Sequence, residues 1–423
     1  MYRRSDSGHR GEVEPESNDL SGLRFVLLQG PSSRFFLHLG RALQMKGAAV
    51  SRIGFCPGDR LFWTASAGVY VPYRGQPEDF GDWLLARLSE EGTTDILMLG
   101  DGRAHHAAAL EAIGRSSLST QAWIIEHGYL RPNLILIEPD GMGGNSRIPD
   151  HYKLESTAIP LAAKQHAWPN NFLRDASMDI AYHISNVLFA PLSYPHYHPH
   201  SGIHPFLEYS GWLSRIAQSP LRAMALRSAL SEISDHKGPL FVYPLQLSQD
   251  LQLVRYGTGE TQKETCDRII ASFLKEASED ACLVVKVHPL DNGLTNWRRR
   301  LAKAGKRIIY LDGGNLDSLL QRSSGVVTVN STVGIAALRA GVPTLALGQA
   351  VYRTAGLTWE GPLDKFWRGA DPPLVERVDA FMHLLAAKFH VPGTFDGPGA
   401  PVGARELARW LARSTEHVKG GVA

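Results

Sequence analysis

Short apolar runs separated by polar turns predict alternating strands and helices, and the pattern is clearest between residues 323 and 348. Residues 326–329 are apolar and β-branched, which predicts a buried parallel strand. Residues 333–340 have the apolar spacing of a helix, and Gly341 stands where a helix C-cap glycine belongs. Residues 344–347 predict a second strand. The stretch is therefore a predicted strand–helix–strand unit.

The turn inside this unit is polar, because it consists of Asn330, Ser331 and Thr332. These residue types often cap helix N-termini. Their hydroxyls and the backbone N–H groups at such a turn can bind an anion, and ligands of open α/β sheets lie at the carboxyl ends of strands. The same residues are equally consistent with an ordinary capped helix in a Rossmann-like layer. Both interpretations stay open at this point.

The first half of the chain repeats this rhythm. Its predicted strands are 23–29, 49–55, 95–99 and 122–125, and its predicted helices are 35–46 and 78–90. Three of these strands end in polar clusters, at Gln29, Asp101 and Glu126. Because the carboxyl ends of parallel strands line one crevice, we expect Asp101 and Glu126 to converge on one rim. Taken alone, either acid would more often be a helix cap or a solvated turn residue.

The second half predicts a second domain of the same kind. Its predicted strands are 239–244, 281–287, 307–311, 326–329 and 344–347, and its predicted helices are 263–277, 297–304, 315–321, 333–340, 374–388 and 404–414. The predicted fold class is therefore α/β, with two Rossmann-like domains facing a central cleft. We expect the two terminal helices to pack near the junction of these domains.

The predicted domain organisation has five parts. They are a disordered tail (1–20), an N-terminal Rossmann-like domain (21–150), a helical and loop connecting region (151–237), a C-terminal Rossmann-like domain (238–390), and a C-terminal helix and tail (391–423). The connecting region is rich in histidine, but the spacing does not match known zinc motifs, and prolines break any helix that could align the rings. The histidines concerned are His196, His198, His200 and His204.

Composition and short motifs narrow the functional classes. The formal net charge of the 423 residues is +2, which gives no signature of nucleic-acid binding. The three cysteines lack CxxC spacing and fit a reducing compartment. The turn at residues 30–33 lacks both the GxGxxG fingerprint and the Walker lysine. No run approaches the ~20 apolar residues that span a bilayer, and the polar N-terminus does not resemble a signal peptide. We expect a cytoplasmic protein, with a peripheral membrane role left open.

Several motifs taken together resemble one family. They are LQGPSSRFF, GDRLFW, GDGRAHH, EHGYLRPNLILIEPDGMGGNS, the pair Gln246 and Asp250, KVHPLD, VTVNSTVGIAALRAGVPTLALGQAVY and a nearby GLT. This set is similar to the capsule polysaccharide biosynthesis and export family of Gram-negative bacteria, across roughly residues 23–360. The members it resembles most add the first β-linked Kdo, an acidic eight-carbon sugar activated as CMP-Kdo, to a phosphatidylglycerol terminus. The resemblance implies a retaining glycosyltransferase of GT-B architecture.

The resemblance also implies roles for individual residues. His288 and Pro289 match an HP motif that contacts the nucleotide phosphate, and Asn330, Ser331 and Thr332 match a serine/threonine cluster that holds the same phosphate. The N-terminal domain is implied to carry acceptor binding and catalysis, and the C-terminal domain to bind the nucleotide sugar.

The catalytic motif departs from the family pattern. Glu126 with Gly128 resembles an acidic-acidic-glycine motif, but His127 occupies the second acidic position. The departure leaves open whether Glu126 or Asp101 is the nucleophile or the base. The loop at residues 257–261 also departs from the family pattern.

The chemistry implied for this site needs no metal and no cofactor. Lys286, His288 and the hydroxyl turn can neutralise the CMP phosphate, and on a strand Lys286 and His288 would share one face. Arg103 and Arg131 could pair with the sugar carboxylate; each could instead form a salt bridge that stabilises the fold. The implied partners are a CMP-sugar donor, a phospholipid acceptor at the inner membrane surface, and other capsule assembly or export proteins, but no nucleic acid.

Two alternatives stay open. The first is a non-catalytic factor for capsule export or assembly, although a scaffold does not need polar residues gathered at strand ends in both domains. The second is a GT-B transferase that uses another nucleotide sugar, such as UDP-N-acetylglucosamine. Release of CMP from CMP-Kdo, without release of UDP from UDP sugars, would separate these alternatives from the Kdo transferase.

Overall fold

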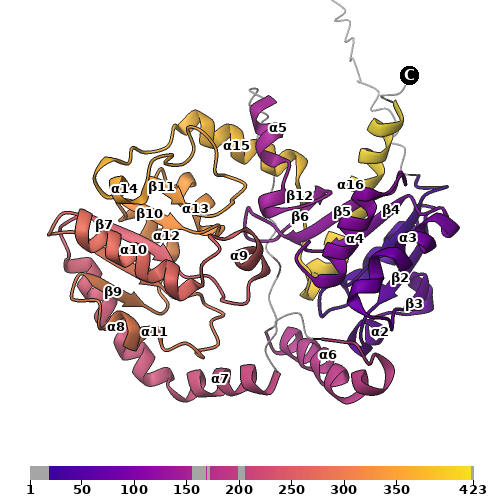
Figure 1. Cartoon of the computed structure of the whole chain (residues 1–423), viewed down its shortest axis with the longest axis horizontal. Helices are drawn as coiled ribbons and strands as arrows, with labels where there is room; N and C mark the ends of the chain where they lie inside the picture. The colour runs from indigo at the N-terminus through magenta and orange to yellow at the C-terminus, as the bar shows by residue number, and fades with distance from the viewer. Residues whose placement is uncertain (1–18, 155–167, 169–171, 199–204, 421–423) are drawn as a thin grey trace, which may run out of the picture.

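The computed structural model describes residues 19–154, 168, 172–198 and 205–420. Figure 1 shows two α/β units side by side, joined by helices along one end of the molecule. Each unit has its own sheet, and the described residues contain no sheet that runs through both. The predicted α/β class with two Rossmann-like domains is confirmed.

The N-terminal unit is built on a seven-stranded sheet with the order β12-β6-β5-β4-β1-β2-β3. Strands β5, β4, β1, β2 and β3 are mutually parallel, whereas β6 pairs antiparallel with β5 and β12 pairs antiparallel with β6. The strands are β1 (Arg24–Leu27), β2 (Ala49–Gly54), β3 (Val69–Pro72), β4 (Asp95–Leu99), β5 (Gln121–His127), β6 (Leu134–Pro139) and β12 (His390–Pro392).

The C-terminal unit is built on a five-stranded sheet with the order β11-β10-β7-β8-β9, in which all neighbours are parallel. The central strands are buried along their whole length, which explains why their sequences are continuous apolar runs. The strands are β7 (Leu240–Pro244), β8 (Cys282–Lys286), β9 (Ile308–Leu311), β10 (Gly325–Thr328) and β11 (Thr344–Ala346).

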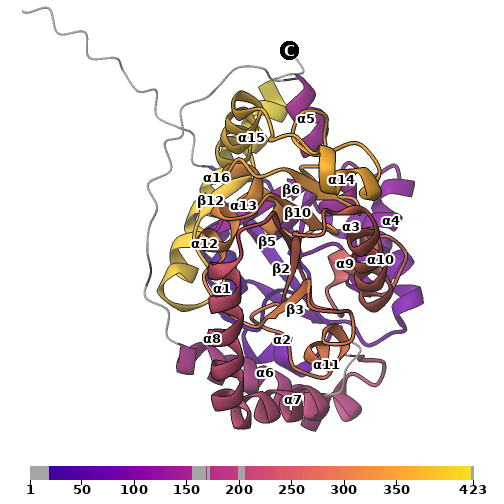
Figure 2. The same cartoon turned by 90° about the vertical axis from the view of Figure 1, so that its left-hand side faces the viewer.

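Helices cover the sheets (Figures 1 and 2). The helices are α1 (Phe35–Gln44), α2 (Pro57–Leu61), α3 (Phe80–Glu91), α4 (Ala104–Arg115), α5 (Ile148–Leu154), α6 (Phe172–Ser193), α7 (Pro205–Ala217), α8 (Ser219–Asp235), α9 (Leu251–Tyr256), α10 (Gln262–Glu276), α11 (Trp297–Leu301), α12 (Leu316–Gln321), α13 (Val333–Arg339), α14 (Leu363–Gly369), α15 (Val375–Lys388) and α16 (Ala400–Gly420). Short 3-10 turns are η1 (Ala65–Ala67), η2 (Pro77–Asp79), η3 (Gly143–Asn145) and η4 (Gly397–Gly399).

The C-terminal segment differs from the prediction, because it returns to the N-terminal unit. Strand β12 extends the first sheet, and α16 packs along α1 instead of near the junction. The physical reason is the apolar stripe of α16, in which Ala404, Leu407 and Leu411 are fully buried against the core of the first sheet. The C-terminal helix expected within 391–423 is α16, and both it and β12 pack on the N-terminal unit.

Two smaller predictions also differ. Leu20, placed in the predicted tail, is buried in the core, while residues 1–18 lie outside the described part of the chain. In the connecting region the sequence predicts one helix over 212–230, but the structure has two, α7 and α8, because a proline at the start of α8 begins a new helix. His200 and His204 lie outside the described residues.

Metal-binding clusters and membrane-spanning helices are both absent from the described residues. No group of histidine, cysteine or acidic side chains there could hold a metal ion. The described helices also include none with the length and apolar character of a membrane span.

Candidate functional site

The carboxyl ends of the two sheets meet through Asp101, which follows β4. Its side chain is fully buried and accepts hydrogen bonds from the Tyr256 hydroxyl at 2.6 Å and the Met142 amide at 3.3 Å. The Asp101 carbonyl accepts a third from Arg255 Nη1 at 2.6 Å. Tyr256 and Arg255 belong to α9 of the C-terminal unit. Asp101 therefore fastens α9 to the first sheet. The structure does not place it on the open rim where it was expected.

The Tyr256–Asp101 hydrogen bond gives a first prediction. Tyr256→Phe should lower the free energy of unfolding by about 1–3 kcal/mol, because a buried carboxylate loses a donor. Urea unfolding would measure the change. Tyr152→Phe is the matched control, since its hydroxyl bonds to a carbonyl at the surface. Equal stability of the two variants would contradict the assigned role of the bond.

Glu126 lies where β5 reaches the same edge of the sheet. Its side chain is partly exposed, and Oε1 accepts a hydrogen bond from the His127 amide at 2.9 Å. Gly100, with a φ of 65°, lies so close that a Cβ there would stand 3.3 Å from Glu126 Oε2. The glycine therefore leaves room for the carboxylate, which is held at the strand end beside the segment that leads to Asp101.

Arg131 of the N-terminal unit acts electrostatically on two residues of the C-terminal unit, Asp250 and His288. Burial raises the pKa of Asp250, the negative charge of Glu126 raises it further, and the charge of Arg131 lowers it. Burial lowers the pKa of His288, and Arg131 lowers it further. The charges of Glu126 and Arg131 in the N-terminal unit therefore act on Asp250 of the C-terminal unit, and the charge of Arg131 also acts on His288. Arg131 is exposed, in the turn between β5 and β6.

His288 is held as a neutral donor. Its Nδ1 accepts a hydrogen bond from the Leu290 amide at 3.1 Å. An Nδ1 that accepts leaves the proton of a neutral imidazole on Nε2. The lowered pKa keeps the ring neutral at neutral pH. His288 therefore offers one N–H donor, and Pro289 beside it is exposed.

The turn after β10 combines a structural residue with two partly exposed hydroxyls. The Asn330 side chain accepts from Gln246 Nε2 at 2.8 Å and donates to the Gln252 carbonyl at 2.8 Å. Asn330 therefore anchors the turn. Ser331 Oγ accepts from the Val333 amide at 3.2 Å, and Thr332 stands directly before α13. Both are partly exposed.

This turn and His288 are separated by a single strand. In the second sheet β10 and β8 flank β7, so the ends of β10 and β8 are roughly 10 Å apart. A phosphate group together with the sugar atoms attached to it is long enough to contact both strand ends. Residues on both sides of this gap, His288 and the Asn330–Thr332 turn, were expected from the sequence to bind the phosphate.

Two predicted cations are engaged elsewhere in the fold. Lys286, at the end of β8, is buried, and its ammonium donates to the carbonyl of Gly313 beyond β9. Burial lowers its pKa. Arg103, before α4, donates to the Gly30 carbonyl at 3.2 Å. The structure therefore gathers Arg131 but not Arg103 beside Glu126.

A buried acid that the sequence analysis missed lies next to Asp101. Glu138, in β6, is fully buried and accepts hydrogen bonds from the hydroxyls of Tyr129 and Ser146. Burial raises its pKa to about 8, and the charge of Asp101 contributes. A glutamate inside the apolar run LILIEP is the signal that could have drawn attention to it. Asp250 was noticed only as part of a resemblance, although it caps α9 by accepting from the Gln252 amide.

Curated relatives are similar to this chain over most of its length. The Escherichia coli capsule polysaccharide export protein KpsS is 28% identical over 382 residues, covering 88% of this chain and 96% of that relative. The capsule polysaccharide modification protein LipB of Neisseria meningitidis serogroup B is 28% identical over 375 residues, covering 85% of this chain and 88% of the relative.

A solved structure is also similar, the beta Kdo 2,7 transferase KpsC of Thermosulfurimonas dismutans. It has 12% sequence identity and a TM-score of 0.45, and the match covers 91% of this chain and 99% of that chain. The profile of the family described as capsule polysaccharide biosynthesis protein matches residues 94–395, from β4 to beyond β12. The chain belongs to the capsule polysaccharide biosynthesis protein family.

Proposed function

We propose that the protein is a retaining glycosyltransferase that transfers β-Kdo from CMP-Kdo to a phosphatidylglycerol-type lipid. The observation that carries the proposal is electrostatic coupling between the two units: Glu126 and Arg131 of the first act on Asp250 of the second, and Arg131 also acts on His288. Two carboxylates, a neutral imidazole and an exposed guanidinium are the groups that sugar transfer with an anionic donor requires. A scaffold for export would not need them there. The Kdo specificity rests on the motifs of the sequence.

On the donor side, the CMP phosphate would lie between His288 and the turn after β10. His288 Nε2–H and the hydroxyls of Ser331 and Thr332 would donate to the phosphate oxygens, which stabilises CMP as it leaves. Asn330 and Gln246 hold the turn in position. Lys286 lowers the pKa of His288 through its charge and would add to the positive potential. No metal is needed for this neutralisation.

At the sugar, retention follows from two displacements. A carboxylate oxygen attacks the anomeric carbon, the bond from that carbon to the CMP phosphate oxygen breaks, and CMP leaves. The acceptor hydroxyl then attacks the same carbon, the carboxylate is released, and a base takes the hydroxyl proton. Glu126 takes one of these roles, and Asp250 is available for the other. Asp101 supports both by holding α9, at whose start Asp250 stands. Arg131 would pair with the Kdo carboxylate.

The test of the function is the release of CMP. The purified protein with phosphatidylglycerol should release CMP from CMP-Kdo and produce a Kdo-bearing lipid, but should release no UDP from UDP-N-acetylglucosamine. Release of UDP would favour the transferase that uses another nucleotide sugar. Failure to release either nucleotide would favour the export factor.

A second prediction concerns nucleotide affinity. His288→Ala and Ser331→Ala should each weaken CMP binding about tenfold or more, because each removes a hydrogen bond to a charged phosphate. Isothermal titration calorimetry would measure the dissociation constants. Ser318→Ala is a matched control on an exposed helix of the same unit. Unchanged affinity in both site variants would place the nucleotide elsewhere.

A further inference from the structure

Helix α6 is amphipathic with its apolar face turned outward. Ile184, Leu188 and Leu192 recur every four residues and are 51%, 59% and 89% exposed. The opposite face carries Tyr182 and Asn186, which are buried against α2. The buried face of α6 carries the polar groups that bond to the rest of the protein, and its apolar side chains face solvent. Packing within the fold therefore does not explain why the outward face is apolar.

Helices α7 and α8 continue this exposed apolar character. Leu213 and Ile216 of α7 are 67% and 65% exposed, and Leu221 and Met224 of α8 are similar. Two arginines of these helices, Arg215 and Arg222, turn inward and form ion pairs with Asp312, whereas Arg227 of α8 is exposed. Between residues 180 and 214 the sequence has no lysine or arginine and a single carboxylate, Glu208.

These faces lie at one end of the molecule. Figures 1 and 2 both place α6 and α7 at the lower end, with α8 rising from it. Helix α6 packs on the N-terminal unit through α2, whereas α8 packs on β9 of the C-terminal unit. The apolar surface is therefore supplied by both units. A broad surface of this kind suits a lipid bilayer better than the groove that a single peptide would occupy.

A cationic and aromatic rim borders this surface where α6 ends. Arg74 lies over the ring of Tyr194 and Arg60 over the ring of Tyr70, and the two tyrosine hydroxyls are 2.9 Å apart. Both arginines are exposed and form no ion pair with a carboxylate among the described residues. Tyrosine and arginine with an apolar neighbour are typical of the membrane–water interface. The exposed guanidinium charges complement anionic headgroups.

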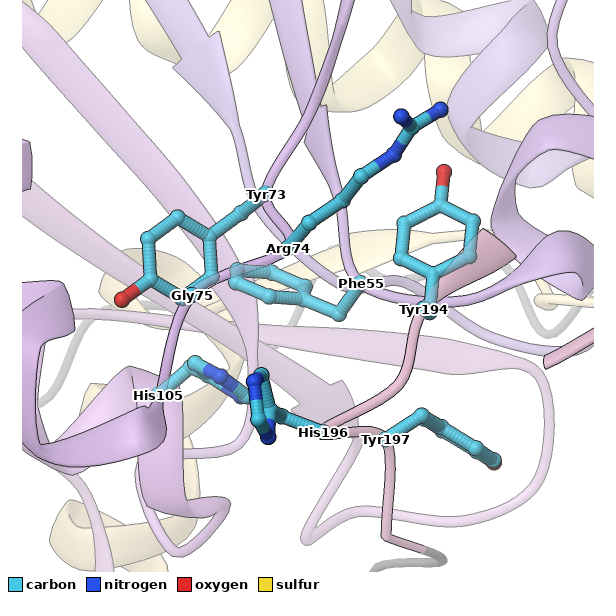
Figure 3. A pocket seen from close by; sticks show the side chains of 8 residues that line it. All are labelled: Phe55, Tyr73, Arg74, Gly75, His105, Tyr194, His196 and Tyr197. Atoms are coloured by element: carbon cyan, nitrogen blue, oxygen red, sulfur yellow. The ribbon is translucent and has the colours of Figure 1, made fainter. Parts of the chain in front are cut away.

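A small pocket opens beside this rim (Figure 3). Arg74, Tyr194 and His196 line it together with Phe55, Tyr73 and His105. Phe55, Tyr73 and His105 follow β2, β3 and β4, so the pocket stands at the carboxyl edge of the first sheet, as Glu126 does. A headgroup that entered from the apolar surface would therefore meet the catalytic edge of the sheet.

We propose that the outward faces of α6, α7 and the start of α8 bind the surface of an anionic phospholipid bilayer, with Arg60 and Arg74 at the level of the headgroups. The inference rests on the proposed function, because a lipid acceptor requires access to a membrane. Docking in this orientation turns the carboxyl edge of the first sheet toward the lipid that accepts the sugar.

Vesicle sedimentation tests the proposal. The full chain should sediment with vesicles of equimolar phosphatidylcholine and phosphatidylglycerol, and more weakly with phosphatidylcholine alone. The double variants Leu188→Glu with Leu192→Glu, and Leu213→Glu with Ile216→Glu, should each lower the partition coefficient at least tenfold. Arg74→Gln should lower the preference for the anionic vesicles. Met45→Glu, at a site 76% exposed at the C-cap of α1, is the matched control and should bind as the wild type does.

Other outcomes would overturn the proposal. The surface variants should keep the melting temperature of the wild type, so lost binding cannot be attributed to unfolding. Wild-type binding in both double variants, or a wild-type dimer that Leu192→Glu dissociates, would show that the face does not dock on lipid. Sedimentation without CMP release would contradict the proposed function alone. CMP release with detergent-dispersed phosphatidylglycerol, without sedimentation, would contradict the docking alone.

Discussion

Glu126→Gln is expected to lower the rate of Kdo transfer at least ~100-fold while CMP-Kdo still binds, because the amide can act neither as nucleophile nor as base. The carboxylate is partly exposed at the end of β5, and Gly100 leaves room beside it. Its negative charge raises the pKa of Asp250 in the C-terminal unit. A single-turnover assay of CMP release, with donor affinity measured separately, distinguishes lost chemistry from lost binding.

The comparison variants decide between the acids. Glu111→Gln, on the exposed face of α4, is the matched control and should turn over normally. Asp250→Asn should lower the rate of Kdo transfer by a comparable factor if Asp250 takes the complementary role. Asp101→Asn should lower stability together with activity, since its contacts fasten α9. Near-normal turnover of Glu126→Gln would remove Glu126 from the mechanism, and normal turnover of all three site variants would favour the export factor.

The ends of the strands were predictable from the sequence because local rules determine them. The apolar run before Glu126 and the polar turn at Asn330, Ser331 and Thr332 could be recognised from neighbours in the chain. Their structural counterparts β5 and β10 end within a few residues of the predictions. The parallel arrangement predicts that the polar clusters share one carboxyl edge, but it does not predict that Asp101 is buried there.

What the sequence did not predict depends on contacts between distant segments. The hydroxyl that binds Asp101 comes from Tyr256, 155 residues further along the chain. The apolar stripe of α16 predicts a buried face but not its partner α1. Glu126 and Asp250 become neighbours only when the two units meet. Periodicity identifies which face of an element is buried, whereas the contact that buries it is a property of the whole fold.

Glu138 is a further residue whose chemistry depends on its surroundings in the fold and not on its neighbours in the sequence. Its pKa of about 8 in the folded protein exceeds the ordinary glutamate value of 4.5 because the side chain is buried. Between these pH values the folded state keeps a proton that the unfolded chain has released. The free energy of unfolding should therefore fall as pH rises from 4.5 to 8, by up to ~1.4 kcal/mol per pH unit from this group.

Glu138→Gln should remove that part of the pH dependence, because the amide has no proton to lose and can still form hydrogen bonds with Tyr129 and Ser146. Urea unfolding of both proteins at several pH values isolates the contribution, since Asp396, whose pKa burial raises to about 6, is common to both. As the pH rises from 5 to 8, the free energy of unfolding of the variant should increase by several kcal/mol relative to that of the wild type. The exposed control Glu90→Gln should show no such gain. A difference that does not change with pH would mean that Glu138 is already ionised in the folded protein, balanced by its two hydroxyl donors.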